Sequence, residues 1–411
     1  MNYRTRHMEP KLESYSGFFK TVLVVGARQV GKSSLLAHQF PEMKGFVFDA
    51  VQDVHGVRRD PDLFLDNFPP PLILDEIQHV PELLSAIKRR VDRHTGSGQY
   101  IMTGSQNLSV LRQVSESLAG RVGILHLDGM TPAEMAGNVQ KPGWLEKYLE
   151  APAECWGDVE CLDGPTGGTA HFLWRGTLPG LLDADNAIIP GYMHSYVETY
   201  VARDVRVIGN IGDLSDFGRF LRLSAALSGR EINTAQLGRD IGVNPKTARN
   251  WLNTLIHSYQ WLELPAYHGD TIKRISRKPK GYLRDTGLIC HLMGISTPEA
   301  LSAHPALGSI FESWAACWIV RLSEQLPSPP ILYHWRSDGG GEVDIVLERD
   351  GYLYPIEVKC ATTLTRHDTR GIRAFRNTYG SDRVKTGIVI YAGQEPRPIS
   401  DIAIALPWTA L

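Results

Sequence analysis

The residues best suited to chemistry form a glycine-rich loop near the amino terminus, in the stretch TVLVVGARQVGKSSLL. Gly26, Gly31, Lys32 and Ser33 follow the phosphate-loop pattern, in which glycines let backbone N–H groups wrap phosphates, the lysine reaches the outer phosphates and the hydroxyl holds Mg²⁺. A glycine turn before an ordinary helix is the alternative. The loop residues expected to contact ATP are Gly26, Ala27, Arg28, Gln29, Val30, Gly31, Lys32, Ser33 and Ser34.

Two further segments end in polar residues suited to ATP hydrolysis. The apolar run in PLILDEIQ stops at Asp75, which we expect to bind Mg²⁺, and Glu76, which we expect to polarise the attacking water. The run QYIMTGSQ leads to Thr103 and Ser105, where a hydroxyl either senses the γ-phosphate or caps the next helix. Alone, LILDE equally fits a strand before a solvated turn. The loop upstream strengthens the ATPase interpretation.

Strands and helices must alternate for these residues to meet. Residues 21–25 form a short β-branched run, and SSLLAHQF after Lys32 has helical spacing. The alternation continues to about residue 127. It therefore predicts a mostly parallel sheet with helices on both faces.

A basic region follows in the middle of the chain. REINTAQLGRDIGVNPKTARNWLNTLIHSYQWLEL contains two helical patterns with Gly242 at the turn and Pro245 in the first turn of the second helix, and the sequence after it predicts a β-hairpin wing. Residues 217–290 hold twelve Lys and Arg residues against five Asp and Glu residues. This pattern indicates a winged helix that binds nucleic acid, or one used only for protein packing or as a lid of the ATPase. The expected phosphate contacts are Lys246, Arg249, Lys273, Arg274, Arg277 and Lys278.

The segment EVDIVLERDGYLYPIEVKC predicts two strands joined by a turn at Asp350 and Gly351. Glu357 and Lys359 are two residues apart and so point the same way. With Asp344 they reproduce the D…ExK pattern of the restriction-endonuclease-like fold, in which carboxylates hold Mg²⁺ and the lysine assists attack on a phosphodiester. A charged hairpin without chemistry, or a fold that binds DNA without cutting it, remains open. Glu312 in GSIFESWAACWIV is a further candidate acid of this site.

Several of these segments, GARQVGKSSLL, LILDEIQHVPELLSAIKRRVD, TGSQN and ESLAGRVGILHLDGMTPAE, resemble a prokaryotic AAA+ ATPase family. YVARDV, KRISRKPKGYLRDTGL and HWRSDGGGEVDIVL with IEVK are similar to the carboxy-terminal domain of unknown function of that family, so the resemblance covers most of the chain. It implies a homo-oligomer, a hexameric ring or a helical assembly. It also implies an arginine that completes the neighbouring subunit's site, for which Arg121 and Arg203 are candidates unless they form internal ion pairs.

The expected fold class is α/β, with a parallel-sheet P-loop domain, a helical and winged-helix region and an α/β restriction-endonuclease-like domain. The chain has 411 residues, which indicates two or three domains. A stretch rich in glycine and proline begins near residue 135 and is typical of a boundary. We expect an ATPase domain at 1–135, a connecting segment at 136–200, a winged-helix region at 201–295 and a nuclease-like domain at 296–411.

The composition limits the kinds of site that the chain can hold and its expected location in the cell. Lys and Arg number 43 against 45 Asp and Glu, so a polyanion site must be a local patch. Five scattered cysteines fit neither a disulfide framework nor a zinc cluster. The amino terminus MNYRTRHMEP lacks the apolar core of a signal peptide, and no run of about 18 apolar residues occurs. We therefore expect a cytoplasmic protein with no membrane partner.

The leading hypothesis is an ATPase that uses ATP and Mg²⁺ and acts on DNA, branched or single-stranded, in remodelling, repair or recombination. A second hypothesis is an ATP-controlled oligomeric switch in defence or regulation, with an inert nuclease-like domain. A third is an ATP-licensed, Mg²⁺-dependent nuclease. These hypotheses share the ATP site and differ in what the rest of the chain does.

Overall fold

The computed structural model describes residues 3–411 except 106–113, 115–117, 140–141, 165–166, 202–213, 271, 273, 275–276 and 338. The chain divides into two compact units, Met1–Gly129 with His257–Tyr259 and Met130–Ile256 with Gln260–Leu411. Among the described residues no helix is both long and apolar enough to cross a membrane.

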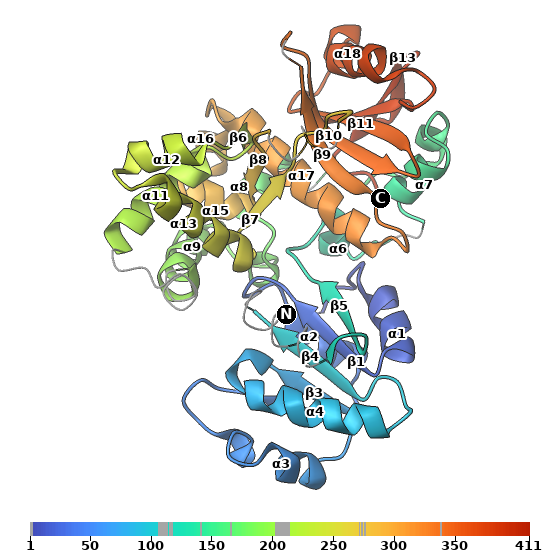
Figure 1. Cartoon of the computed structure of the whole chain (residues 1–411). Helices are drawn as coiled ribbons and strands as arrows, with labels where there is room; N and C mark the ends of the chain where they lie inside the picture. Colours follow the sequence, from blue (N-terminus) through green and yellow to red (C-terminus); the bar gives the residue numbers. More distant parts are fainter. Residues whose placement is uncertain are drawn as a thin grey trace. The chain divides into compact units, whose positions relative to one another are not determined.

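The described part of the first unit is built on a five-stranded sheet in the order β2-β3-β4-β1-β5, in which every pairing is parallel (Figure 1). The expected parallel sheet is thus confirmed. Its strands are β1 (Thr21–Val25), β2 (Lys44–Val47), β3 (Leu72–Asp75), β4 (Tyr100–Gly104) and β5 (Val122–His126). Its helices are α1 (Glu9–Phe18), α2 (Lys32–Gln39), α3 (Pro61–Asn67) and α4 (Pro81–Arg93).

Local sequence explains these elements. All five residues of β1 are buried, as a continuous β-branched run requires in the middle of a parallel sheet. In α4, Leu83, Leu84, Ile87 and Val91 are buried at helical spacing, which gives that helix its apolar stripe. Strands β3, β4 and β1 are neighbours and run parallel, so their carboxyl ends lie together at one edge of the sheet. Parallel sheets bind ligands at this edge.

The second unit begins with helices and continues into a small sheet. The helices are α6 (Pro132–Ala136), α7 (Trp144–Glu150), α8 (Gly168–Arg175), α9 (Ile189–Tyr196), α11 (Leu214–Ala226), α12 (Thr234–Ile241) and α13 (Pro245–His257). The small sheet has the order β6-β8-β7, with β6 (Arg230–Glu231), β7 (Trp261–Leu264) and β8 (Lys280–Leu283) all antiparallel.

The two expected helices of the middle region are present where the sequence places them. The Asn233 side chain caps α12 by accepting from Ala235 N at 3.1 Å, and Gly242 ends it with a left-handed φ of 89°. Pro245 is the first residue of α13. An antiparallel strand pair follows as β7 and β8, with β6 on the other side of β8, but β7 lies in WLEL, before the segment predicted to form the wing.

A larger mixed sheet forms the carboxy-terminal part, in the order β13-β14-β12-β11-β10-β9 (Figure 1). Its strands are β9 (Ile331–Arg336), β10 (Glu342–Arg349), β11 (Tyr352–Lys359), β12 (Gly387–Tyr391), β13 (Arg397–Ser400) and β14 (Ala403–Pro407). The nearby helices are α15 (Thr286–Leu292), α16 (Pro298–Ser302), α17 (Leu307–Gln325) and α18 (Arg370–Tyr379).

The expected hairpin of this part is present. Asp350 and Gly351 have φ of 52° and 81°, the pair of positive values that a tight turn between β10 and β11 needs. Helix α17 is buried on nearly all sides, because apolar and small residues surround its axis. It contacts both β8 and β11, and so joins the small sheet to the large one.

Candidate functional site

The glycine-rich loop connects the end of β1 to the start of α2 and can be built only with glycine at its first position. A Cβ atom on Gly26 would lie 1.9 Å from the backbone oxygen of Leu127, which is held beside β1 by the hydrogen bond from Leu127 N to Val25 O. Gln29 and Gly31 have left-handed φ of 65° and 93°. Left-handed residues in such a loop are typical of the anion-binding nests that cradle phosphates.

Lys32 is the first residue of α2, and its side chain is buried. Its ammonium group donates to the carbonyl oxygens of Gly26 at 3.0 Å and Ala27 at 2.8 Å. The charge therefore lies inside the curve of the loop. This is the position from which it can reach the outer phosphates of a nucleotide.

Asp75, at the end of β3, connects helix α2 to strand β4. Ser33 Oγ donates to Asp75 Oδ2 at 2.7 Å, and Thr103 Oγ1 donates to Asp75 Oδ1. Asp75 is buried at the carboxyl end of β3. A hydroxyl and a carboxylate are oxygen ligands of the kind that Mg²⁺ prefers, so this pair fits the metal role predicted for Ser33 and Asp75.

Glu76 follows Asp75 in a left-handed conformation with φ of 58°. Its backbone N–H donates to Thr103 Oγ1 at 3.0 Å, and its Oε2 accepts from Ser105 Oγ at 3.1 Å and from Gln78 Nε2. Thr103 and Ser105 thus orient the two acids. Their other predicted role, capping the next helix, falls on residues outside the described part of the chain.

Sequence reasoning missed two polar residues of this site. Gln78 bonds both Glu76 and Ser105, the latter at 3.1 Å, from a single 3₁₀ turn. Arg6 is buried, and its guanidinium donates to Val30 O at 2.9 Å and Asp128 O at 2.7 Å, so it ties the phosphate loop to the chain after β5. Arg6 lies outside every motif of the sequence, and Gln78 lies at the end of PLILDEIQ without a spacing that assigns it a role.

Of the two arginines predicted to act in a neighbouring subunit's site, the structure describes only Arg121. Arg121 forms an ion pair with Asp92 in which both side chains are partly exposed. An exposed pair of this kind contributes about 0–1 kcal/mol, so it does not hold Arg121 in place against a stronger partner. Arg203 lies outside the described residues.

The predicted phosphate-contacting residues differ in their surroundings. Lys246, at the start of α13, and Lys278 are exposed. Arg249 and Arg274 instead donate to acids of the same chain, Glu263 and Glu348, each at 2.8 Å. Arg277 donates to the backbone oxygen of Arg336 at 3.0 Å, and Lys273 lies outside the described residues. Fewer basic side chains are therefore available to contact phosphate than the count of Lys and Arg residues indicates.

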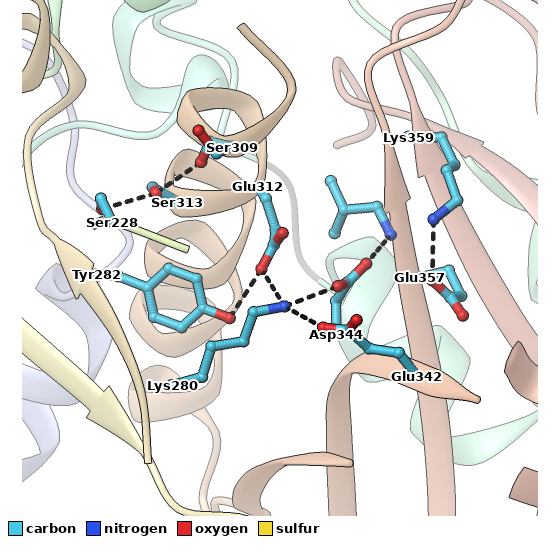
Figure 2. A network of polar contacts seen from close by, with 11 residues as sticks. Ser228, Lys280, Tyr282, Ser309, Glu312, Ser313, Glu342, Asp344, Glu357 and Lys359 are labelled. Atoms are coloured by element: carbon cyan, nitrogen blue, oxygen red, sulfur yellow. Dashed lines mark hydrogen bonds and ion pairs between the residues drawn. The ribbon is translucent and has the colours of Figure 1, made fainter. Parts of the chain in front are cut away.

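The predicted nuclease-like residues do come together in the second unit. Glu357 and Lys359 lie on one side of β11, with Lys359 Nζ donating to Glu357 Oε2 at 3.1 Å. Asp344 on β10 accepts from Val358 N at 2.9 Å through Oδ2. Glu312 approaches from α17. Figure 2 shows these side chains converging from the helix and the two strands.

A lysine that sequence reasoning did not place here lies at the centre of the cluster. The Lys280 ammonium is 2.7 Å from Glu312, 2.8 Å from Glu342 and 3.0 Å from Asp344 (Figure 2). Among the described residues no group of three or more His, Cys, Asp or Glu side chains is arranged to hold a metal. The Lys280 ammonium thus lies among the acids where the sequence predicts Mg²⁺.

The pKa values of the three acids in this cluster are shifted in different directions. Burial raises the pKa of the Glu312 carboxyl to about 8, and the Asp344 carboxylate adds to the shift. Burial and Asp344 likewise raise the pKa of Glu357. Burial opposes ionisation of Asp344, but the ammonium groups of Lys280 and Lys359 outweigh it and lower the pKa of that carboxyl. The cluster thus has an aspartate held ionised between two lysines, together with two glutamic acids, Glu312 and Glu357, whose protonated forms are favoured by burial.

The raised pKa of Glu312 predicts a pH-dependent stability difference. The folded chain binds the Glu312 proton up to about pH 8, whereas the ordinary glutamate pKa is 4.5, so this contribution to stability is complete below pH 4.5 and is lost as pH rises through 8. Each pKa unit corresponds to about 1.4 kcal/mol. Relative to the wild type, Glu312→Gln is therefore expected to gain stability as pH rises through this window.

Thermal melts of the wild type and Glu312→Gln across this pH range measure the difference. Glu395→Gln, at an exposed position of the same part of the chain, is the control and should track the wild type. A constant gap between Glu312→Gln and the wild type at all pH values would contradict the assignment.

Three family matches cover separate parts of this chain. Residues 19–136 match the AAA domain family. Residues 169–299 match one Domain of unknown function (DUF8612), and residues 307–411 match another (DUF4143). The first match contains the phosphate loop and the paired acids, and the last contains Glu312, Asp344, Glu357 and Lys359.

Relatives along most of the length are known in mycobacteria. The uncharacterized proteins Rv2008c of Mycobacterium tuberculosis and Mb2031c of Mycobacterium bovis are each 29% identical over 391 residues, which is 94% of this chain and 79% of theirs. Their names give no activity.

Solved structures are similar at lower identity. The Walker-type ATPase PABY2304 of Pyrococcus abyssi is 16% identical, with a TM-score of 0.42 over 71% of this chain and 98% of that one. A RuvB variant of Thermotoga maritima is 18% identical, with a TM-score of 0.27 over 63% of this chain and 86% of that one. The family match, the phosphate loop and the paired acids at the edge of a parallel sheet together identify residues 19–136 as an AAA domain of the P-loop ATPase type.

Proposed function

We propose that this chain hydrolyses ATP and uses the energy on DNA, branched or single-stranded, in remodelling, repair or recombination. The observation that carries the ATPase part is the hydrogen-bonded path from Ser33 through Asp75 and Thr103 to Glu76. It joins the start of helix α2 to the ends of strands β3 and β4, and it ends at a carboxylate suited to proton transfer.

The residues of the loop bind and orient the nucleotide. Mg²⁺, when bound by Ser33 and Asp75, supplies neutralisation of phosphate charge. Lys32 adds positive charge at the outer phosphates. A water oxygen then forms a bond to the γ-phosphorus while the bond to the ADP oxygen breaks, and Glu76 accepts the proton of the water; ADP and phosphate leave.

Subunits of this chain assemble into a homo-oligomer in this proposal, as a hexameric ring or a helical assembly. An arginine of one subunit then stabilises the charge that develops on the neighbour's γ-phosphate. Arg121 is a candidate because its pairing with Asp92 is exposed and therefore weak. Arg203 is the other candidate.

The DNA part of the proposal rests on the helix pair α12 and α13. Asn244 caps the turn before α13 by accepting from Thr247 N at 2.8 Å, and Lys246 stands exposed in the first turn of that helix. Lys278 is exposed shortly before β8. Two lysines, one near the start of a helix and one just before a strand, suit phosphate contacts, which position a protein on DNA without reading the bases.

Charge reversal at Lys246 tests this part. Lys246→Glu is expected to weaken binding of single-stranded, duplex and four-way-junction DNA several-fold and to flatten the salt dependence, because each lost phosphate contact lowers the slope by about 0.9. Fluorescence anisotropy of labelled DNA at several salt concentrations measures both quantities. The control Arg93→Glu reverses an exposed charge on α4. Equal effects of the two variants, or no binding by the wild type at low salt, would contradict the proposal.

A second candidate function is a switch in which the ATP state controls assembly with a protein partner and the carboxy-terminal part is inert. The specific observation that favours it is the Lys280 ammonium among the carboxylates of the nuclease-like cluster. The same observation weighs against an ATP-licensed nuclease, which needs those carboxylates for Mg²⁺. The switch predicts slow ATP turnover that DNA does not change.

A further inference from the structure

The side chain of Lys280 extends from the small sheet into a cluster of acids that belongs to α17 and β10. It is 4% exposed. Its ammonium lies within 3.0 Å of Glu312, Glu342 and Asp344, so each of its three N–H groups has a carboxylate acceptor. Figure 2 shows the ammonium at the point where these carboxylates meet. Carboxylate oxygens are also the ligands that hard divalent ions prefer.

We propose that Lys280 is a built-in replacement for a divalent cation, and that the acids around it form a latent site for Mg²⁺, Mn²⁺ or Ca²⁺ that opens only when this lysine is removed. The wild-type cluster then binds no divalent ion and cuts no phosphodiester. This inference goes beyond the proposed function and depends on neither ATP nor DNA.

The position of Lys280 in the backbone explains why the lysine is a fixed part of the cluster. Its strand β8 is the central strand of the small sheet, with Lys280 opposite Glu231 of β6 and Leu264 of β7. A Cβ on the next residue, Gly281, would lie 2.2 Å from the Trp261 ring, so the strand packs tightly at this point. Withdrawal of Lys280 therefore requires disruption of pairing on both sides.

A second donor on the same strand supports the arrangement. Tyr282 is two residues after Lys280, so both side chains point to the same face of β8. Its hydroxyl donates to Glu312 Oε1 at 3.0 Å, and the Lys280 ammonium is 2.7 Å from the same oxygen. Strand β8 thus presents two donors to the acid of α17. A divalent ion at this position would have to displace the charge of Lys280 or be repelled by it.

The other charged residues of the cluster also have partners within the chain. Lys359 Nζ donates to Glu357, and Asp344 Oδ2 accepts from Val358 N while its Oδ1 faces Lys280. The acids of the D…ExK pattern thus have their partners within the chain. Replacement of Lys280 by methionine keeps the length of the side chain but removes the positive charge, and leaves Glu342 and Asp344 without the cation that lies between them.

Binding of divalent ions to the full chain tests the proposal. All proteins carry Asp75→Asn, so that the carboxylate of the ATP site does not add to the signal. The parent protein and Lys280→Met are compared by thermal melts with and without millimolar MnCl₂, and by Tb³⁺ luminescence excited through tyrosine, for which Tyr282 is close to the site. Lys385→Met is the control, because Lys385 lies over the Tyr352 ring at 3.7 Å in the same part of the chain.

The proposal predicts that MnCl₂ leaves the melting temperature of the parent and of Lys385→Met unchanged. Lys280→Met should melt several degrees lower without the ion, regain the loss with MnCl₂, and show several-fold higher Tb³⁺ emission. Adding Asp344→Asn to Lys280→Met should remove both gains.

Three results would overturn it. The first is an Asp344-dependent ion response in the parent. The second is a folded Lys280→Met that responds to the ion no more than the parent does. The third is a Lys280→Met that stays unfolded with MnCl₂ present during expression and refolding, checked with Lys280→Gln as a second neutral variant.

Discussion

Replacing Glu76 with glutamine is expected to lower kcat for ATP hydrolysis by about 10²–10⁴-fold, the range that a positioned general base contributes. ATP affinity should change little, because in the proposed mechanism Ser33 and Asp75, rather than Glu76, hold Mg²⁺·ATP. Among the described residues the side-chain donors to Glu76 contact Oε2, which leaves Oε1 to accept from a water. An amide at this position keeps the shape and loses the ability to take a proton.

Single-turnover hydrolysis and equilibrium binding of a fluorescent ATP analogue separate the two effects. Glu82→Gln is the matched control, because Glu82 is an exposed carboxylate on the neighbouring helix α4. It should hydrolyse ATP at the wild-type rate. A Glu76→Gln protein that turns over ATP as fast as this control would exclude Glu76 as the base.

The second large effect is expected at Gly26. A Cβ there would lie 1.9 Å from Leu127 O and 3.0 Å from Leu127 C, and both atoms are backbone. Because Leu127 N is bonded to Val25 O at 2.8 Å, neither strand can move aside without breaking the edge of the sheet. Gly26→Ala is expected to destabilise the first unit by about 3 kcal/mol and to abolish ATP binding, because the loop must shift.

Gly17→Ala is the control for this change. Gly17 lies in α1 of the same unit, and a Cβ there would meet nothing within 4 Å. Alanine in a helix is favoured over glycine by about 0.5–1 kcal/mol, so this variant should melt at or slightly above the wild-type temperature. Wild-type ATP affinity and melting temperature in Gly26→Ala would show that the loop packs otherwise.

The ATP site was predictable because its signals are local. Each strand is an apolar run that stops at polar residues. The parallel order of the strands brings Asp75, Glu76 and Thr103 to one edge of the sheet. Arg6 and Gln78 were missed for a physical reason. Arg6 bonds Val30 O and Asp128 O, and Gln78 bonds Ser105, and only the tertiary fold brings these groups close.

In the carboxy-terminal cluster, the sequence predicts contacts within one strand but not ion pairs between residues far apart in the chain. Alternation along β11 places Glu357 and Lys359 on one side, and the structure agrees. Lys280 was counted only as part of a basic stretch, because its acidic partners lie on α17 and β10, far along the chain. Arg274 was likewise expected to contact phosphate, yet it pairs with Glu348. Net charge in a window does not reveal which charges are already neutralised across the fold.

The central claim is that ATP hydrolysis in this chain is coupled to DNA. Steady-state ATP hydrolysis by the full chain, alone and with single-stranded, duplex and four-way-junction DNA at low salt, tests it most directly. We predict that one DNA form raises turnover well above the rate of the protein alone, and that Glu76→Gln removes both rates. Wild-type turnover that no DNA form changes would contradict the claim and favour the ATP-controlled switch.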